Sequence, residues 1–284
     1  MLKATGSTFI GCASDFADAS LVLFGAPFDG TVSFRPGTRF APAQIRLESV
    51  GLETYSPYFD ADLTDFALCD LGDLELPFGT TARALQLIQE QARQIFQNKK
   101  KLIMIGGEHL VSLPAVTEAK RLYEDLVVLH FDAHTDLRTE YLGEPLSHAT
   151  VMRRIWEVVG DGRIWQFGIR SGTREEFHWA KAGHTFLQLH DFTGLEAAIA
   201  GIGRRPVYLT IDLDVLDPSV LPGTGTPEAG GVSFLDLMTA LQAVSNLNII
   251  GGDLVELAPH YDPSGVSTAV ASKVLRELIF TVSL

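Results

Sequence analysis

The residues of this 284-residue chain best suited to chemistry form two short acidic clusters. One is Asp132-Ala133-His134-Thr135-Asp136, and the other is Asp212-Leu213-Asp214. In extended backbone, side chains two residues apart point to the same side, so each cluster can direct its polar groups towards one point. Carboxylates held this close raise one another's pKa values unless a cation offsets their charge. Because carboxylates can bridge ions, the two clusters together predict a site for two divalent metal ions.

The types of these residues narrow the choice of metal and reaction. Neither cysteine, Cys12 or Cys69, has metal-site spacing, so a closed structural zinc site is not expected. Carboxylates with imidazoles suit manganese, while iron, cobalt and zinc stay open. Water bound to such an ion becomes a nucleophile, because its pKa falls from about 15.7 to about 7 in the best case. The clusters therefore predict a two-metal hydrolase.

Strands and helices must hold these clusters in place. Apolar runs without alternation, typical of strands covered on both faces, lie at residues 21–24, 102–105, 126–131, 164–168, 207–213 and 249–257. Segments of helical period lie between them, at residues 83–97, 114–123, 146–158, 234–244 and 267–280. This alternation predicts an α/β fold with one parallel sheet between layers of helices. No linker or repeat is visible, so we expect a single domain over residues 1–284.

Polar residues follow four of the expected strands. His109 comes after Ile105, Asp132 after Phe131, and Glu256 near the end of the run that begins at residue 249. Asp212 and Asp214 close the run from residue 207 in the same way. Sites in open α/β sheets form beyond the carboxyl ends of the strands. We therefore expect these acids and histidines to meet at one edge of the sheet.

A proton donor for the leaving group and an anchor for the substrate complete such a site. His148 and Glu256 are the candidates. Taken alone, a residue such as His148 is more often a histidine at a helix start or in the core, and one such as Glu256 is more often an ion-pair partner. Both alternatives stay open on the residues alone, and the expected location at the metal edge favours the catalytic interpretation.

The composition limits the partners of the chain. Its formal net charge of −13 disfavours nucleic acid and anionic membrane surfaces, both of which are bound mainly through Lys and Arg. No signal peptide is visible, and no apolar run approaches the length that spans a bilayer. We expect a cytoplasmic protein acting on a small molecule.

Several motifs together resemble those of the ureohydrolases, the family of arginase and agmatinase. In chain order the segments are Phe34-Arg35-Pro36-Gly37-Thr38-Arg39-Phe40-Ala41-Pro42, Gly106-Gly107-Glu108-His109, Asp132 to Asp136, Ser147-His148-Ala149, Asp212 to Pro218, and Glu256-Leu257-Ala258-Pro259. The resemblance extends from about residue 25 to residue 284. It implies a three-layer α/β/α sandwich with an eight-stranded, mainly parallel sheet, and a homo-oligomer that is a trimer or a hexamer.

The resemblance also implies the cofactor and the site residues. It implies two Mn2+ ions per subunit, one bound by His109, Asp132, Asp136 and Asp212, the other by Asp132, His134, Asp212 and Asp214. A hydroxide between the ions would attack the guanidinium carbon and release urea and an amine. Glu256 would pair with the guanidinium, and His148 would carry a proton to the departing amine. Asp136 joins them in the predicted catalytic set.

Two departures from the family pattern stand near these motifs. Glu108 occupies a position where many members have Asp, and Ala149 follows His148 where Gly is common. Neither is a metal ligand, so neither changes the predicted reaction.

The substrate depends on the rim of the site. Residues 138–144 are rich in acids, and Pro222-Gly223-Thr224-Gly225-Thr226-Pro227 resembles the agmatinase form of its loop. Both favour a cationic guanidino substrate, agmatine or its aminopropyl extension, over arginine. Glu144 and Glu176 are possible partners of its ammonium group, whereas Arg138 would suit the carboxylate of guanidinobutyrate. For Glu176 a solvated acid on a helix face is an equal alternative.

Two other classes of protein share parts of this pattern. A two-metal phosphoesterase uses similar ligands but also needs cations for phosphate, and the expected edge offers few apart from Arg138 and Arg170. A non-catalytic relative would have lost some of the six ligand positions, all of which are present here. We therefore expect agmatine hydrolysis to putrescine and urea.

Overall fold

Eight strands form one sheet in the computed structural model, which describes residues 8–284. The strand order is β4-β1-β5-β10-β9-β6-β7-β8, and every neighbouring pair is parallel. The strands are β1 (Leu21–Ala26), β4 (Leu68–Asp73), β5 (Lys101–Gly106), β6 (Val127–Phe131), β7 (Ile164–Ile169), β8 (Phe186–Leu189), β9 (Pro206–Asp212) and β10 (Asn248–Val255). A separate hairpin joins β2 (Tyr55–Ser56) and β3 (Ala61–Asp62). The parallel sheet confirms the α/β prediction.

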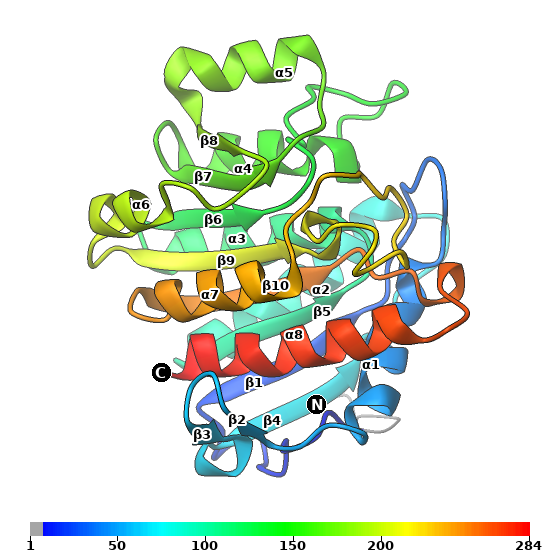
Figure 1. The fold of residues 1–284 in the computed structure, drawn as a ribbon, viewed down its shortest axis with the longest axis vertical. Coiled ribbons are helices and arrows are strands. Elements are labelled where there is room, and N and C mark those ends of the chain that lie inside the picture. Colours follow the sequence, from blue (N-terminus) through cyan, green and yellow to red (C-terminus); the bar gives the residue numbers. More distant parts are fainter. Residues whose placement is uncertain (1–7) are drawn as a thin grey trace.

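Helices cover both faces of the sheet, as Figure 1 shows. Both faces of the sheet are apolar and need this cover: in β9, Leu209 packs into the core on one face and Tyr208 into the core on the other. One face is covered by α1 (Ala41–Ser49), α6 (Leu195–Ile202), α7 (Phe234–Val244) and α8 (Val266–Ser283). The other is covered by α2 (Thr81–Gln97), α3 (Ser112–Leu122) and α4 (Val151–Val159), with α5 (Arg174–Trp179) following β7. The fold is the three-layer α/β/α sandwich that the resemblance implied.

The six expected strands and five expected helices are all present; the helix at residues 234–244 has the expected bounds, and the others have one or both ends shifted. The helix expected from residue 146 begins at Val151, because Ser147 is extended and His148 to Thr150 form a 3-10 turn. Sequence reasoning missed the strands β2, β3, β4 and β8 and the helices α1, α5 and α6. No helix within residues 8–284 is long and apolar enough to cross a membrane.

Candidate active site

The carboxyl ends of the central strands deliver the candidate residues to one edge of the sheet. His109 begins the 3-10 turn after β5, Asp132 directly follows β6, and Asp212 is the last residue of β9. Asp214 lies in the 3-10 turn at Leu213–Val215, and Glu256 directly follows β10. The neighbours β5, β10, β9 and β6 are adjacent in the sheet, so these residues converge as expected.

Three carboxylates surround the imidazole of His109. Its Nδ1 lies 3.1 Å from Asp132 Oδ2, 3.4 Å from Asp136 Oδ2 and 3.2 Å from Asp212 Oδ2. Donor atoms that share one divalent ion at about 2.0–2.2 Å are themselves separated by about 3 to 3.5 Å. The Nδ1 atom is buried and has no hydrogen-bond partner among residues 8–284. These positions fit a divalent cation between the four residues.

A second group lies beside the first and shares Asp132. His134 Nδ1 is 3.0 Å from Asp214 Oδ2 and 3.5 Å from Asp132 Oδ1, while the other oxygen of Asp132 faces His109. Asp132 can therefore contribute one oxygen to each group. Of Asp212, Oδ2 faces His109 and Oδ1 accepts the main-chain N–H of Asp214 at 2.9 Å. The geometry fits two cations with Asp132 between them.

The electrostatics of the cluster also fit cations. Burial raises the pKa of Asp136 and of Asp212 well above the usual range, and neighbouring carboxylates raise both further. Burial opposes a charged His109, but the carboxylates of Asp132 and Asp212 outweigh it and hold its pKa well above the usual value. Without metal, the cluster therefore retains protons at positions that divalent cations would neutralise.

Hydrogen bonds behind the cluster hold its residues in place. His109 Nε2 lies 2.9 Å from Thr210 Oγ1, which donates to Asp253. His130 Nε2 lies 2.7 Å from Asp132 Oδ2, and its Nδ1 lies 3.1 Å from the amide nitrogen of Gln166. Since that amide nitrogen is a donor, His130 Nε2 carries the proton shared with Asp132, so His130 supports the carboxylate rather than binding metal.

Sequence reasoning missed several residues of the site. His130 had a detectable signal, because it is a polar residue in an apolar strand two positions before Asp132. Ser33 lies in a loop of the cavity wall that no local pattern marks, and Tyr141 lies within the expected rim segment 138–144 but was not singled out.

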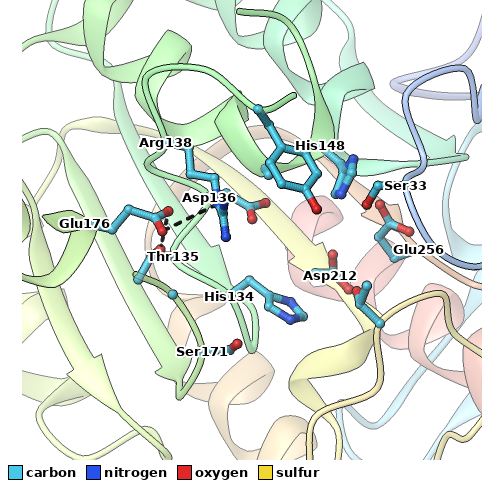
Figure 2. Close-up of a pocket in the computed structure, with 14 residues that line it drawn as sticks. Ser33, His134, Thr135, Asp136, Arg138, His148, Ser171, Glu176, Asp212 and Glu256 are labelled. Carbon is cyan, nitrogen blue, oxygen red and sulfur yellow. Dashed lines mark hydrogen bonds and ion pairs between the residues drawn. The ribbon is translucent and has the colours of Figure 1, made fainter. Parts of the chain in front are cut away.

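A cavity of about 250 Å³ opens onto the cluster, with His134, Asp136, Asp212, His148 and Glu256 in its walls. Figure 2 shows His148, Ser33 and Glu256 together on one side, with Glu176 on the opposite side. Glu256 is buried, and its Oε1 accepts the main-chain N–H of His109 at 2.9 Å. Burial and the nearby Glu108 raise the pKa of Glu256 to about 8. Burial lowers the pKa of His148 to about 4, so its ring is neutral at neutral pH.

The rim residues differ in where they lie. Arg138 lines the cavity, with its guanidinium 4.6 Å from the ring centre of Tyr141 and its Nε 3.8 Å from Glu176. Glu176 is buried, not solvated, and accepts hydrogen bonds from Thr135 Oγ1 at 2.7 Å and from the main-chain N–H of Leu137 at 2.9 Å. Glu144 is exposed on a turn and does not line the cavity.

Comparisons with known proteins agree with this geometry. Residues 19–281 match the Arginase family. The chain is 46% identical over 278 residues to an agmatinase of Bacillus subtilis (strain 168), covering 97% of this chain and 96% of that one. It is 33% identical over 277 residues to a guanidinobutyrase of Pseudomonas aeruginosa, covering 93% of this chain and 86% of the relative. The crystal structure of agmatine ureohydrolase of Thermoplasma volcanium superposes with a TM-score of 0.89 at 32% identity, covering 98% and 94% of the two chains. The chain therefore belongs to the arginase family of ureohydrolases.

Proposed function

We propose that this chain hydrolyses agmatine to putrescine and urea with the help of two Mn2+ ions. The observation that carries the proposal is the single cavity in which Glu256 and His148 lie beside the carboxylate and histidine cluster. The similarity to agmatinases, at 46% identity over nearly the whole chain, supports agmatine as the substrate.

The proposed metal ligands are His109, Asp132, His134, Asp136, Asp212 and Asp214. Carboxylate and imidazole ligands suit manganese, and thiolates are absent from this set. When bound, the ions would lower the pKa of water and so supply a hydroxide nucleophile at neutral pH. Asp136, whose main chain has the uncommon φ of 53°, aims its carboxylate into this cluster from the cavity wall.

Glu256 is proposed to bind the guanidinium group. One of its oxygens is already fixed by the main-chain N–H of His109, so the carboxylate has a defined orientation. A planar guanidinium offers paired N–H donors that match a carboxylate. Bound cations favour the ionised form of this buried acid, which is the form that can accept those bonds.

His148 is proposed to move a proton to the departing amine. Its ring lines the cavity and is neutral at neutral pH, so it can take up a proton before passing it on. The ring is held edge-on to Tyr141, with the ring centres 5.7 Å apart.

A second substrate is favoured by one observation. Arg138 places a guanidinium in the cavity wall, where it would attract a carboxylate such as that of guanidinobutyrate. Glu176 is directed towards Arg138 and main-chain donors, which leaves it less able to bind an ammonium group. A phosphoesterase is disfavoured because Arg170, the other cation expected near this edge, donates to the main-chain oxygens of Asp214 and Glu228.

The test is a urea-release panel with the manganese-reconstituted protein on agmatine, aminopropylagmatine, arginine and guanidinobutyrate. We expect the highest kcat/KM with agmatine. Preference for guanidinobutyrate would assign the second function, and urea from none of the four would remove the catalytic proposal. Light scattering on the same sample tests the proposed trimer or hexamer.

A further inference from the structure

A buried acid next to the metal cluster has no task in the proposed reaction. Glu108 is completely buried in the turn between β5 and His109. It forms no ion pair with Lys or Arg in the part of the chain that the structure describes. A buried carboxylate without a cationic partner is costly, so its surroundings need an explanation.

Thr31 connects this acid to the cavity wall. Its main-chain N–H donates to Glu108 Oε1 at 2.6 Å, and its hydroxyl donates to Glu108 Oε2 at 2.5 Å. The loop of Thr31 comes this close because Gly107 has no side chain: a Cβ there would lie 1.8 Å from the main-chain oxygen of Phe28. Glu108 is thus fastened to the loop that also carries Ser33 of the cavity.

The same hydroxyl connects Glu108 to His148. Thr31 Oγ1 accepts the main-chain N–H of His148 at 3.1 Å. Glu108 Oε2 lies 3.9 Å from His148 Nδ1, an atom that is buried and has no hydrogen-bond partner within the described residues 8–284. Burial raises the pKa of Glu108 to about 7. When it is ionised, the carboxylate acts on the ring through charge at this separation, so it affects the ring most when the ring is protonated.

The other surroundings of His148 oppose protonation of its ring. Burial lowers its pKa to about 4, and the charge of Arg138 acts in the same direction. A proton transferred to His148 therefore needs a nearby negative charge, and an ionised Glu108 supplies one 3.9 Å from Nδ1.

We propose that Glu108 is a positioning residue that stabilises the protonated ring of His148 during proton transfer, with Thr31 holding the two together. This inference rests on the proposed ureohydrolase function. Glu108, which stands where many family members have Asp, then takes part in positioning the proton-transfer residue.

The kinetic test uses Glu108→Gln, which keeps the shape and one acceptor for the main-chain N–H of Thr31, but removes the charge and the acceptor for the Thr31 hydroxyl. We expect kcat on agmatine to fall about tenfold, because an opposite charge at this distance is worth about one pKa unit, while KM and bound manganese stay within about twofold. Glu108→Asp, which keeps the charge, should recover most of the loss. Thr31→Val should lower kcat as well, and Thr31→Ser should recover it. Parental kcat in Glu108→Gln, or a loss confined to KM and metal content, would overturn the inference.

A second readout does not depend on turnover. Deuterium exchange at the C2–H of histidine proceeds through the protonated ring, and mass spectrometry resolves it for each histidine peptide. In the manganese-loaded protein at about pH 8, we expect Glu108→Gln to slow exchange at His148 severalfold, with the exposed His178 as internal reference. Equal exchange at His148 in both proteins would contradict the inference, whether or not the parent protein releases urea. Absence of urea release from the parent protein would by itself refute only the proposed function.

Discussion

The main-chain N–H of His109 donates a 2.9 Å hydrogen bond to Oε1 of Glu256, 147 residues later in the chain. This bond joins a proposed metal ligand to the proposed guanidinium anchor across the neighbouring strands β5 and β10. It uses one carboxylate oxygen of Glu256 and leaves the other available to a ligand. The carboxylate of Glu256 is therefore held against the main chain of His109, which is stiffer than another side chain would be.

Glu256→Gln should weaken guanidinium binding and leave the metals in place. The amide keeps an oxygen for His109 but loses the charge, and a hydrogen bond to a charged group contributes about 1.5–3 kcal/mol. We expect kcat/KM on agmatine to fall about 10- to 100-fold with two metals retained, measured by urea release and elemental analysis. Glu144→Gln is the matched control, since Glu144 is exposed outside the cavity. Parental kinetics for Glu256→Gln would show that the anchor is elsewhere.

Asp214→Ala should lose metal and activity together. Its Oδ2 faces His134 at 3.0 Å, and its Oδ1 accepts the main-chain N–H of Ala133 at 3.1 Å. We expect manganese affinity to fall by at least about 100-fold, measured by isothermal titration calorimetry. The control is Asp217→Ala in the following loop, whose carboxylate binds the main chain of Ser219 and Gly230 instead of the cluster. Full metal retention in Asp214→Ala would remove Asp214 from the ligand set.

Arg138→Ala should change the choice of substrate. Arg138 lines the cavity, where its charge favours a carboxylate and opposes an ammonium group. We expect kcat/KM on guanidinobutyrate to fall about tenfold, while kcat/KM on agmatine stays equal or rises. Arg154→Ala is the control, because Arg154 pairs with Glu157 and does not line the cavity. An equal loss on both substrates would mean that Arg138 serves the structure of the rim.

Asp262→Ala should reduce stability in a pH-dependent way. Asp262 Oδ2 accepts from the main chain and hydroxyl of Ser267, each at 2.7 Å, at the start of α8. Hydrogen bonds from Ser264 and Ser267 lower the pKa of Asp262 to about 2, below its ordinary value of 3.8. Its contribution is thus complete above about pH 4 and is lost as the pH falls through about 2. We expect a loss of about 2 kcal/mol in urea unfolding at neutral pH that shrinks below about pH 4. An equal loss at pH 3 and pH 7 would contradict this linkage.

Much of the fold could be predicted because most central strands are apolar on both faces, as in Leu21–Ala26. The strand β4 was not predicted because it contains Asp70 and Asp73, and aspartate is more typical of loops than of strands. In the structure Arg46 of α1 pairs with both, at 2.7 Å from Asp70 Oδ2. That compensation comes from a helix more than 20 residues earlier, and no local pattern reveals it.

The site residues were predictable by type and spacing, whereas their conformations were not. Residues 132–136 were expected to be extended, but Asp136 has a left-handed φ of 53° and Glu256 one of 66°. Such backbone is uncommon for residues other than glycine and persists where the surroundings enforce it. Glu176 enforces this backbone at Asp136, because its carboxylate accepts hydrogen bonds from Thr135 and Leu137 on either side of Asp136. Only tertiary structure supplies this constraint.

The all-parallel sheet has a consequence for how the protein folds. Parallel neighbours are joined by long crossovers, so the cluster cannot form until segments from His109 to Asp214 have been brought together. Cations that bind only the assembled cluster stabilise the native state by mass action, by about 2.7 kcal/mol at a hundredfold excess over Kd. Metal bound at the cluster would then indicate that folding is complete. Removal of the metal by a chelator should speed unfolding at the edge of the sheet where agmatine would bind.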